Sequence, residues 1–197
     1  MLKFKGFEQS MGRSIWDSAF HVLSVASTSG FATVDNAHWP MQASIISLMM
    51  GIMCGCAGST TGGLKADRVL VLIKAIGRQI KQILHPNSVN EIKIGDHIIR
   101  DEDVNPQLLY ITLYTVMLAL SVFLCLMFGE NTHNAFAATV SSLGNVGPAV
   151  EELGSMGNFN SVPDTVKFVY TMDMFLGRIE IYPVLAVVGM MFSSRKK

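Results

Sequence analysis

Long apolar runs dominate the chain, and their lengths predict helices at bilayer depth. Residues 108–128 form a run of 21 residues without a charged side chain, which is long enough for one membrane-spanning helix. Residues 41–57 and 165–192 are also apolar, but the first run dissolves into glycines and hydroxyls and the second carries charges near its middle. The pattern therefore predicts an all-α membrane protein with one simple span and two interrupted segments.

The interruption in the first long segment is the most informative stretch of the sequence. Residues 55–68 read GCAGSTTGGLKADR. Glycine costs roughly 1 kcal/mol relative to alanine inside a helix, and serine and threonine offer the backbone competing hydrogen bonds. In a membrane, irregular backbone persists only where protein covers it or where it lines a water-filled cavity. We therefore interpret this stretch as a pore element rather than a simple anchor.

Two further apolar segments are too short to span a bilayer. Residues 14–26 total 13, and residues 133–143 are shorter still, whereas a span needs about 20. We interpret each as a re-entrant half-helix, the first capped by Ser14. Each half-helix ends in a glycine-containing turn, at 27–33 and at 144–148. An ordinary amphipathic helix in a soluble core is the alternative for the first segment.

The connecting segments are more polar. Residues 64–84 would place apolar and basic side chains on different faces of a helix, which predicts an amphipathic helix that leaves the bilayer toward the cytoplasm. Residues 88–103 favour a short hairpin-like connection with a turn at 95–96. The Asn-Pro pair at 105–106 predicts a helix start, and residues 149–164 read as a polar, acidic outer loop.

A weak internal repeat appears when the chain is shifted by 117 residues. The shift superimposes three pairs of similar residues: Asp17 on Asn134, Ser24 on Ser141, and Gly30 on Gly147. Half-helix, turn, loop and interrupted segment recur in the same order, as they do in many transport proteins. Coincidence between two helical hairpins is the alternative.

The two turns have the composition of a cation filter. Glycine permits backbone conformations that point carbonyl oxygens at a dehydrated cation. The partial negative charge at the C-terminal end of each half-helix also favours a nearby cation. The candidate carbonyl donors are Thr28, Ser29, Gly30 and Phe31 in the first turn, and Asn145, Val146, Gly147 and Pro148 in the second.

Arg178 lies within the last apolar segment, where an arginine costs about 2.5–3.5 kcal/mol on the insertion scale. It should therefore face protein or water. One interpretation is a structural ion pair with Asp173 or Glu180. The other is a fixed positive charge below the filter that limits cation flow and contacts the glycine-rich stretch. The sequence alone does not separate these two interpretations.

Composition and charge support a membrane protein and indicate its orientation. Half of the 197 residues are hydrophobic, 15% are charged and the formal net charge is zero, which argues against nucleic-acid binding. Residues 64–100 carry seven basic side chains, whereas residues 129–164 carry none. The positive-inside rule places the first region and the basic C-terminus in the cytoplasm. The histidines are scattered and the cysteines lie in apolar runs, so no catalytic or metal-binding group is expected and the protein is not predicted to be an enzyme.

Three stretches resemble the Trk/Ktr/HKT superfamily of potassium transporters, most closely the bacterial TrkH type. They are STSGFATVDNAHWP at 27–40, GCAGSTTGGLKADR at 55–68, and SSLGNVGPA at 141–149 together with FLGRIEIYPVL at 175–185. The resemblance implies M1–pore-loop–M2 ion-channel-like repeats with re-entrant pore half-helices and a broken M2 helix, four of which form one pore.

The resemblance also assigns parts of the chain to that pore. Residues 1–103 would be the third repeat without its M1, and residues 104–197 the fourth. Both turns would be filter positions for K⁺, the transported ion, with no bound cofactor, and Arg178 would supply the pore electrostatics. An intramembrane gate loop would consist of Ala57, Gly58, Ser59, Thr60, Thr61, Gly62 and Gly63.

The resemblance finally implies location and partners. We expect a multi-pass protein of the cytoplasmic (inner) membrane, in contact with lipid, that forms homodimers and binds a cytoplasmic nucleotide-binding regulatory subunit like TrkA. We expect the chain to be a C-terminal portion that joins missing N-terminal repeats. A non-conducting membrane subunit that uses its Gly/Ser/Thr stretch for helix packing is the main alternative, and a soluble nucleotide-binding protein is disfavoured by the span at 108–128.

Overall fold

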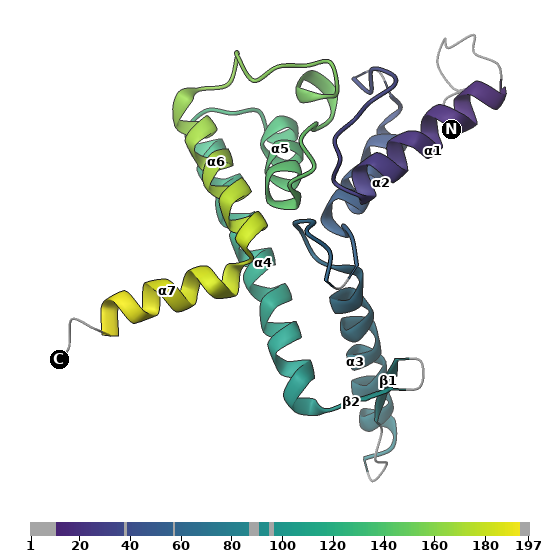
Figure 1. The fold of residues 1–197 in the computed structure, drawn as a ribbon, viewed down its shortest axis with the longest axis vertical. Coiled ribbons are helices and arrows are strands. Elements are labelled where there is room, and N and C mark those ends of the chain that lie inside the picture. The colour runs from purple at the N-terminus through teal and green to yellow at the C-terminus, as the bar shows by residue number, and fades with distance from the viewer. Residues whose placement is uncertain (1–10, 38, 57, 87–90, 95–96, 194–197) are drawn as a thin grey trace.

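The computed structural model describes residues 11–37, 39–56, 58–86, 91–94 and 97–193. This part of the chain is mostly helical (Figure 1). Its elements are α1 (Met11–Ala26), α2 (Met41–Ile52), α3 (Ala66–Leu84), β1 (Ile92–Ile94), β2 (His97–Ile99), α4 (Asp101–Met127), α5 (Thr132–Gly144), the short 3-10 helix η2 (Glu151–Leu153), α6 (Asp164–Ile179) and α7 (Ile181–Ser193).

The short helix α5 is the centre of the packing. It contacts α2, α4 and α6, and Figure 1 shows it in the upper half between α6 and α2. Ala137, Thr139, Val140 and Leu143 are each at most 1% exposed, so α5 is covered around its circumference. Small residues such as Ala137 let neighbouring helices approach closely, which explains how an apolar helix of only 13 residues becomes the core.

Helix α4 is the element that can cross a membrane. Among the described residues, it is the one helix with sufficient length and hydropathy, over Glu102–Met127. Its outward side chains remain apolar: Val116 is 56% exposed and Phe123 is 58% exposed, as expected for a surface that faces lipid. The predicted start at 105–106 is wrong, because α4 begins at Asp101. Burial of Val104 to 1% in a cluster between α3 and the hairpin extends the helix toward its N-terminus.

The connection between α3 and α4 contains the expected hairpin. Strands β1 and β2 pair antiparallel, with Lys93 opposite Ile98. Ile92 is 2% exposed and packs with Val71 of α3, so the hairpin is anchored to the lower half of the molecule in Figure 1. The predicted turn at 95–96 lies outside the described residues.

The predicted break between α2 and α3 is present and begins earlier than expected. Helix α2 ends at Ile52 rather than near residue 57, because the Leu64 amide donates to the Ile52 carbonyl at 2.9 Å and closes the intervening chain on itself. We call residues 53–65 the glycine loop. Cys54 and Cys125 are buried as predicted, whereas Cys56 is exposed, contrary to the expectation for an apolar run.

Two further boundaries differ from the sequence prediction. The cap predicted at Ser14 is wrong, because α1 already begins at Met11 and the Ser14 carbonyl accepts a 2.7 Å bond from Ser18 Oγ inside the helix. The apolar segment at 165–192 divides at Glu180 into α6 and α7. Figure 1 shows α7 leaving α6 at a large angle, so the last segment is not a continuous helix.

Candidate functional site

The first turn follows the end of α1 and is held by a serine of that helix. Thr28 has φ +54° and Gly30 has φ +73°, so the chain reverses within three residues. The Ser24 hydroxyl donates to the Phe31 carbonyl at 2.6 Å and lies 3.1 Å from the Ser29 hydroxyl. These contacts fix the backbone of the turn to its own half-helix.

The second turn follows α5 and is built in the same way. Asn145 has φ +54° and Gly147 has φ +106°. The Ser141 hydroxyl donates to the Pro148 carbonyl at 2.9 Å. The Val146 amide donates to the Ser141 carbonyl at 3.0 Å, which prolongs the half-helix into the turn.

The equivalent contacts lie 117 positions apart in the chain. The Ser29 amide donates to the Ser24 carbonyl at 3.0 Å, as the Val146 amide does to the Ser141 carbonyl. Each serine also binds the carbonyl seven residues further on. The offset found in the sequence therefore relates two turns of the same backbone geometry.

The two turns meet at Gly30. A Cβ atom at this position would lie 2.7 Å from the Val146 carbonyl oxygen and 3.3 Å from Pro148 Cδ. Only glycine fits here without displacing a backbone carbonyl. The structure thus brings together the two turns that the sequence predicted.

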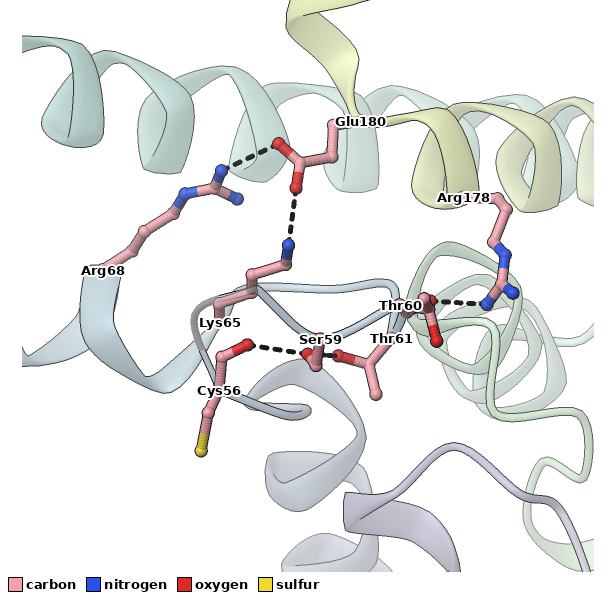
Figure 2. A network of polar contacts seen from close by, with 8 residues as sticks. All are labelled: Cys56, Ser59, Thr60, Thr61, Lys65, Arg68, Arg178 and Glu180. Carbon is pink, nitrogen blue, oxygen red and sulfur yellow. Dashed lines mark hydrogen bonds and ion pairs between the residues drawn. The ribbon is translucent and has the colours of Figure 1, made fainter.

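The glycine loop is bonded to the C-terminal ends of both half-helices. The Gly55 amide donates to the Ala26 carbonyl of α1 at 3.1 Å, and the Gly63 amide donates to the Leu143 carbonyl of α5 at 3.2 Å. Within the loop, Ser59 Oγ donates to the Cys56 carbonyl at 2.7 Å, as Figure 2 shows. The irregular backbone is therefore covered by protein at the point where both half-helices end. Ala57 lies outside the described residues.

Glycines allow this close approach. A Cβ atom at Gly62 would lie 2.7 Å from the Gly144 carbonyl oxygen, and one at Gly144 would lie 2.6 Å from the Gly51 carbonyl oxygen. One at Gly177 would overlap the Leu143 carbonyl oxygen. The sequence analysis assigned Gly144 to the second turn but did not identify it, Gly51 or Gly177 as a packing position, because a glycine carries no sequence signal of what it contacts.

Arg178 reaches the glycine loop. Its Nη1 donates to the Thr60 carbonyl at 2.5 Å (Figure 2), which is the contact proposed for it with the glycine-rich stretch. Among the described residues, Arg178 forms an ion pair with neither Asp173 nor Glu180. Asp173 accepts a 2.6 Å bond from Ser121 Oγ, and Glu180 binds two other cations.

Those cations come from the start of α3. Lys65 Nζ lies 2.8 Å from Glu180 Oε1, and Arg68 Nη2 lies 2.8 Å from Glu180 Oε2. The Arg68 guanidinium also lies 3.7 Å above the centre of the Tyr110 ring. The sequence analysis placed Lys65 and Arg68 only in a basic stretch, because nothing in the sequence links them to a residue more than 100 positions away.

The described residues contain no cluster of three or more His, Cys, Asp or Glu side chains that could hold a metal ion. What they contain instead is a set of backbone carbonyls at two facing turns, with a glycine loop across the ends of α1 and α5 and with Arg178 of α6 bonded to that loop. The partial negative charges at this place therefore come from backbone carbonyls, the groups that line cation filters.

These features fit an all-α membrane protein of the transporter type, in which the short helices α1 and α5 meet two interrupted segments. The model of the family described as "TrkH: Cation transport protein" matches residues 8–196. The chain belongs to the TrkH family.

Curated relatives and a solved structure agree with this assignment. The Trk system potassium uptake protein TrkH of Escherichia coli is 32% identical over 187 residues, which cover 95% of this chain and 38% of that protein. The Trk system potassium uptake protein TrkG of the same species is 30% identical, covering 89% of this chain and 37% of TrkG. The crystal structure of the potassium transporter TrkH from Vibrio parahaemolyticus superimposes with a TM-score of 0.83 at 30% identity, covering 94% of this chain and 40% of that one. The chain thus spans about 38% of the length of the E. coli TrkH that it matches.

Proposed function

We propose that the chain supplies two repeats of a potassium uptake pore, residues 1–103 the third and residues 104–197 the fourth. The observation that carries the proposal is the pair of turns, each tied by a serine to its own half-helix and touching the other at Gly30. Relatives named as Trk potassium uptake proteins support K⁺ as the transported ion.

Selection in this proposal comes from backbone carbonyls. The carbonyl oxygens of residues 28–31 and 145–148 replace part of the hydration shell of K⁺. The C-terminal ends of α1 and α5 add a partial negative charge at the same place. The serine bonds to Phe31 and Pro148 keep the carbonyls from turning toward a smaller ion.

Gating in this proposal comes from the part of the glycine loop at residues 57–63. The loop is bonded to the ends of both half-helices, so an ion that leaves the two turns meets it next. Arg178 holds the loop at Thr60 and places a positive charge there. Both features oppose cation flow until the loop moves.

We further propose the setting in which this pore works. The chain lies in the cytoplasmic membrane in contact with lipid, with its C-terminus in the cytoplasm, as the basic residues between 64 and 100 favour. It joins N-terminal repeats of the same transporter, forms a homodimer and is opened by a nucleotide-binding regulatory subunit like TrkA.

Potassium uptake by a chimera tests the proposal. The chain replaces the segment that it matches in E. coli TrkH, and the chimera is expressed in cells without other potassium uptake. We expect growth at low external K⁺ and uptake well above the vector control. Uptake at the vector level by a correctly inserted chimera would contradict the proposal, as would unchanged uptake after Gly62→Val combined with Gly63→Val.

The alternative of a non-conducting packing subunit has less support. It requires the Gly/Ser/Thr stretch to offer its glycines to another protein. Gly62 and Gly63 are buried inside this chain, against Gly144 and Ile52. We therefore do not adopt it.

A further inference from the structure

Glu180 occupies an unusual position in the last interrupted segment. It separates α6 from α7 with φ +65° and ψ +151°, a region of backbone conformation that side-chain-bearing residues rarely adopt. The following residue, Ile181, is 3% exposed, so the break is fixed inside the protein. Such a conformation persists only where the surroundings hold it.

Two cations hold the Glu180 carboxylate, one on each oxygen. Lys65 and Arg68 both lie 2.8 Å from it; their side chains are 13% and 15% exposed, and that of Glu180 is 30% exposed. By contrast, the ion pair of Lys167 with Asp164 on the same helix α6 involves side chains that are 38% and 97% exposed. Charge-assisted bonds shielded from water are stronger than exposed pairs. The ion pairs of Glu180 therefore stabilise the backbone around them more than the pair of Lys167 with Asp164 does.

Lys65 connects the ion pairs of Glu180 to the glycine loop. Lys65 is the last residue of the glycine loop and precedes α3, and the next amide, that of Ala66, donates to the Gly55 carbonyl at 3.1 Å. Glu180 therefore holds the end of the loop, and Arg178 holds its middle at Thr60. Figure 2 shows both residues reaching the loop from the junction of α6 and α7.

We propose that Glu180 is a positioning residue that holds the glycine loop in place across the ends of α1 and α5, a role that we call the latch. Movement of α7 would then release the loop. This inference rests on the proposed function of the loop as a gate. Because α7 begins directly after Glu180, a displacement of α7 pulls the carboxylate away from both cations. The loop is then retained by fewer contacts and can leave the pathway.

Uptake kinetics of the chimera test the latch. Glu180→Gln keeps the size of the side chain and removes its charge. We expect the maximal rate of K⁺ uptake to rise roughly tenfold, corresponding to about 1.4 kcal/mol. The apparent KM for K⁺ should stay the same, because the two turns are not altered. Asp164→Asn, which breaks the exposed pair on α6, should change neither value.

The outcomes separate the latch from the function on which it rests. A parent chimera without K⁺ uptake contradicts both. A parent with uptake whose Glu180→Gln variant behaves like Asp164→Asn contradicts the latch alone. A variant whose apparent KM changes while its maximal rate does not also contradicts the latch, since the filter would then be the affected part.

Thiol labelling supplies a second readout that does not require uptake. In a Cys56→Ser background of the purified chimera, whose own cysteines outside this chain are replaced, Cys54 and Cys125 remain and both are 0% exposed. Cys54 lies at the start of the glycine loop, whereas Cys125 lies in the cluster around α5 and α6. We expect Glu180→Gln to accelerate labelling of Cys54 and to leave Cys125 unchanged. If Cys54 were labelled at the same rate in Glu180→Gln and in its parent, or if labelling of both thiols were accelerated equally, the latch would be overturned.

Discussion

A methyl group at Gly30 should force the two turns apart. In Gly30→Ala the new Cβ atom would lie 2.7 Å from the Val146 carbonyl oxygen, and real Cβ contacts are essentially never this short. The neighbouring atom is backbone rather than the end of a flexible side chain, so relief requires one of the two turns to move.

The free-energy cost of Gly30→Ala can be divided by comparison with Gly129, a glycine that also has a positive φ. Gly129 has φ +88° and nothing within 4 Å of its added Cβ atom, whereas Gly30 has φ +73° and two close neighbours. Alanine at either position carries the same backbone cost of roughly 1 kcal/mol. The contact at Gly30 adds the cost of overpacking, about 1–3 kcal/mol, which corresponds to roughly a five- to 150-fold change in an equilibrium constant.

Competition uptake measures this difference. In the chimera, the rate of rubidium uptake is followed against increasing Na⁺ for the parent, Gly30→Ala and Gly129→Ala. We expect Gly30→Ala to raise the apparent KM for the larger ion and to lose discrimination against Na⁺, while Gly129→Ala keeps both. Equal behaviour of the two variants would refute the reasoning, because the contact between the turns would then have no role in selection.

Three other substitutions test separate contacts. Ser24→Ala removes the 2.6 Å bond that holds the first turn, so the apparent KM for K⁺ should rise by about three- to tenfold; an unchanged KM contradicts that role. Arg178→Gln removes the 2.5 Å bond to the loop and should raise the maximal uptake rate, whereas a lower rate argues against a barrier. Gly177→Ala drives a methyl group into a backbone carbonyl and should abolish the monodisperse peak in size-exclusion chromatography, which Gly77→Ala, with open space around it, should preserve.

Local composition predicts most of the elements around the site. The helices α1 and α5 and the turns after them follow from short apolar runs that end in glycine and hydroxyl residues. The span in α4 follows from residues 108–128, and the hairpin follows from the polar stretch before them. These features depend on neighbouring residues, so the sequence carries them directly.

Boundaries set by tertiary contacts are not predictable in the same way. Helix α4 starts at Asp101 because Val104 is buried against α3 and the hairpin. Helix α2 ends at Ile52 because the Leu64 amide returns to it. In both cases a residue distant in the chain outweighs the local signal that favoured another boundary.

The contacts that complete the site are also hidden in the sequence. Glu180 breaks a helix although it is not glycine, and its partners Lys65 and Arg68 lie more than 100 residues earlier. Arg178 was expected either to pair with an acid or to contact the loop, and its geometry decides for the carbonyl of Thr60. Spacing along one segment carries no information on which other segment faces it.

The location of a bound cation tests the central claim most directly. Crystals of the chimera grown with thallium in place of potassium would show the ion by its anomalous scattering. We predict density against the carbonyl oxygens of residues 28–31 and 145–148, close to the C-terminal ends of α1 and α5. Density found only elsewhere, with these carbonyls turned toward lipid, would contradict the proposal that the two turns select the ion.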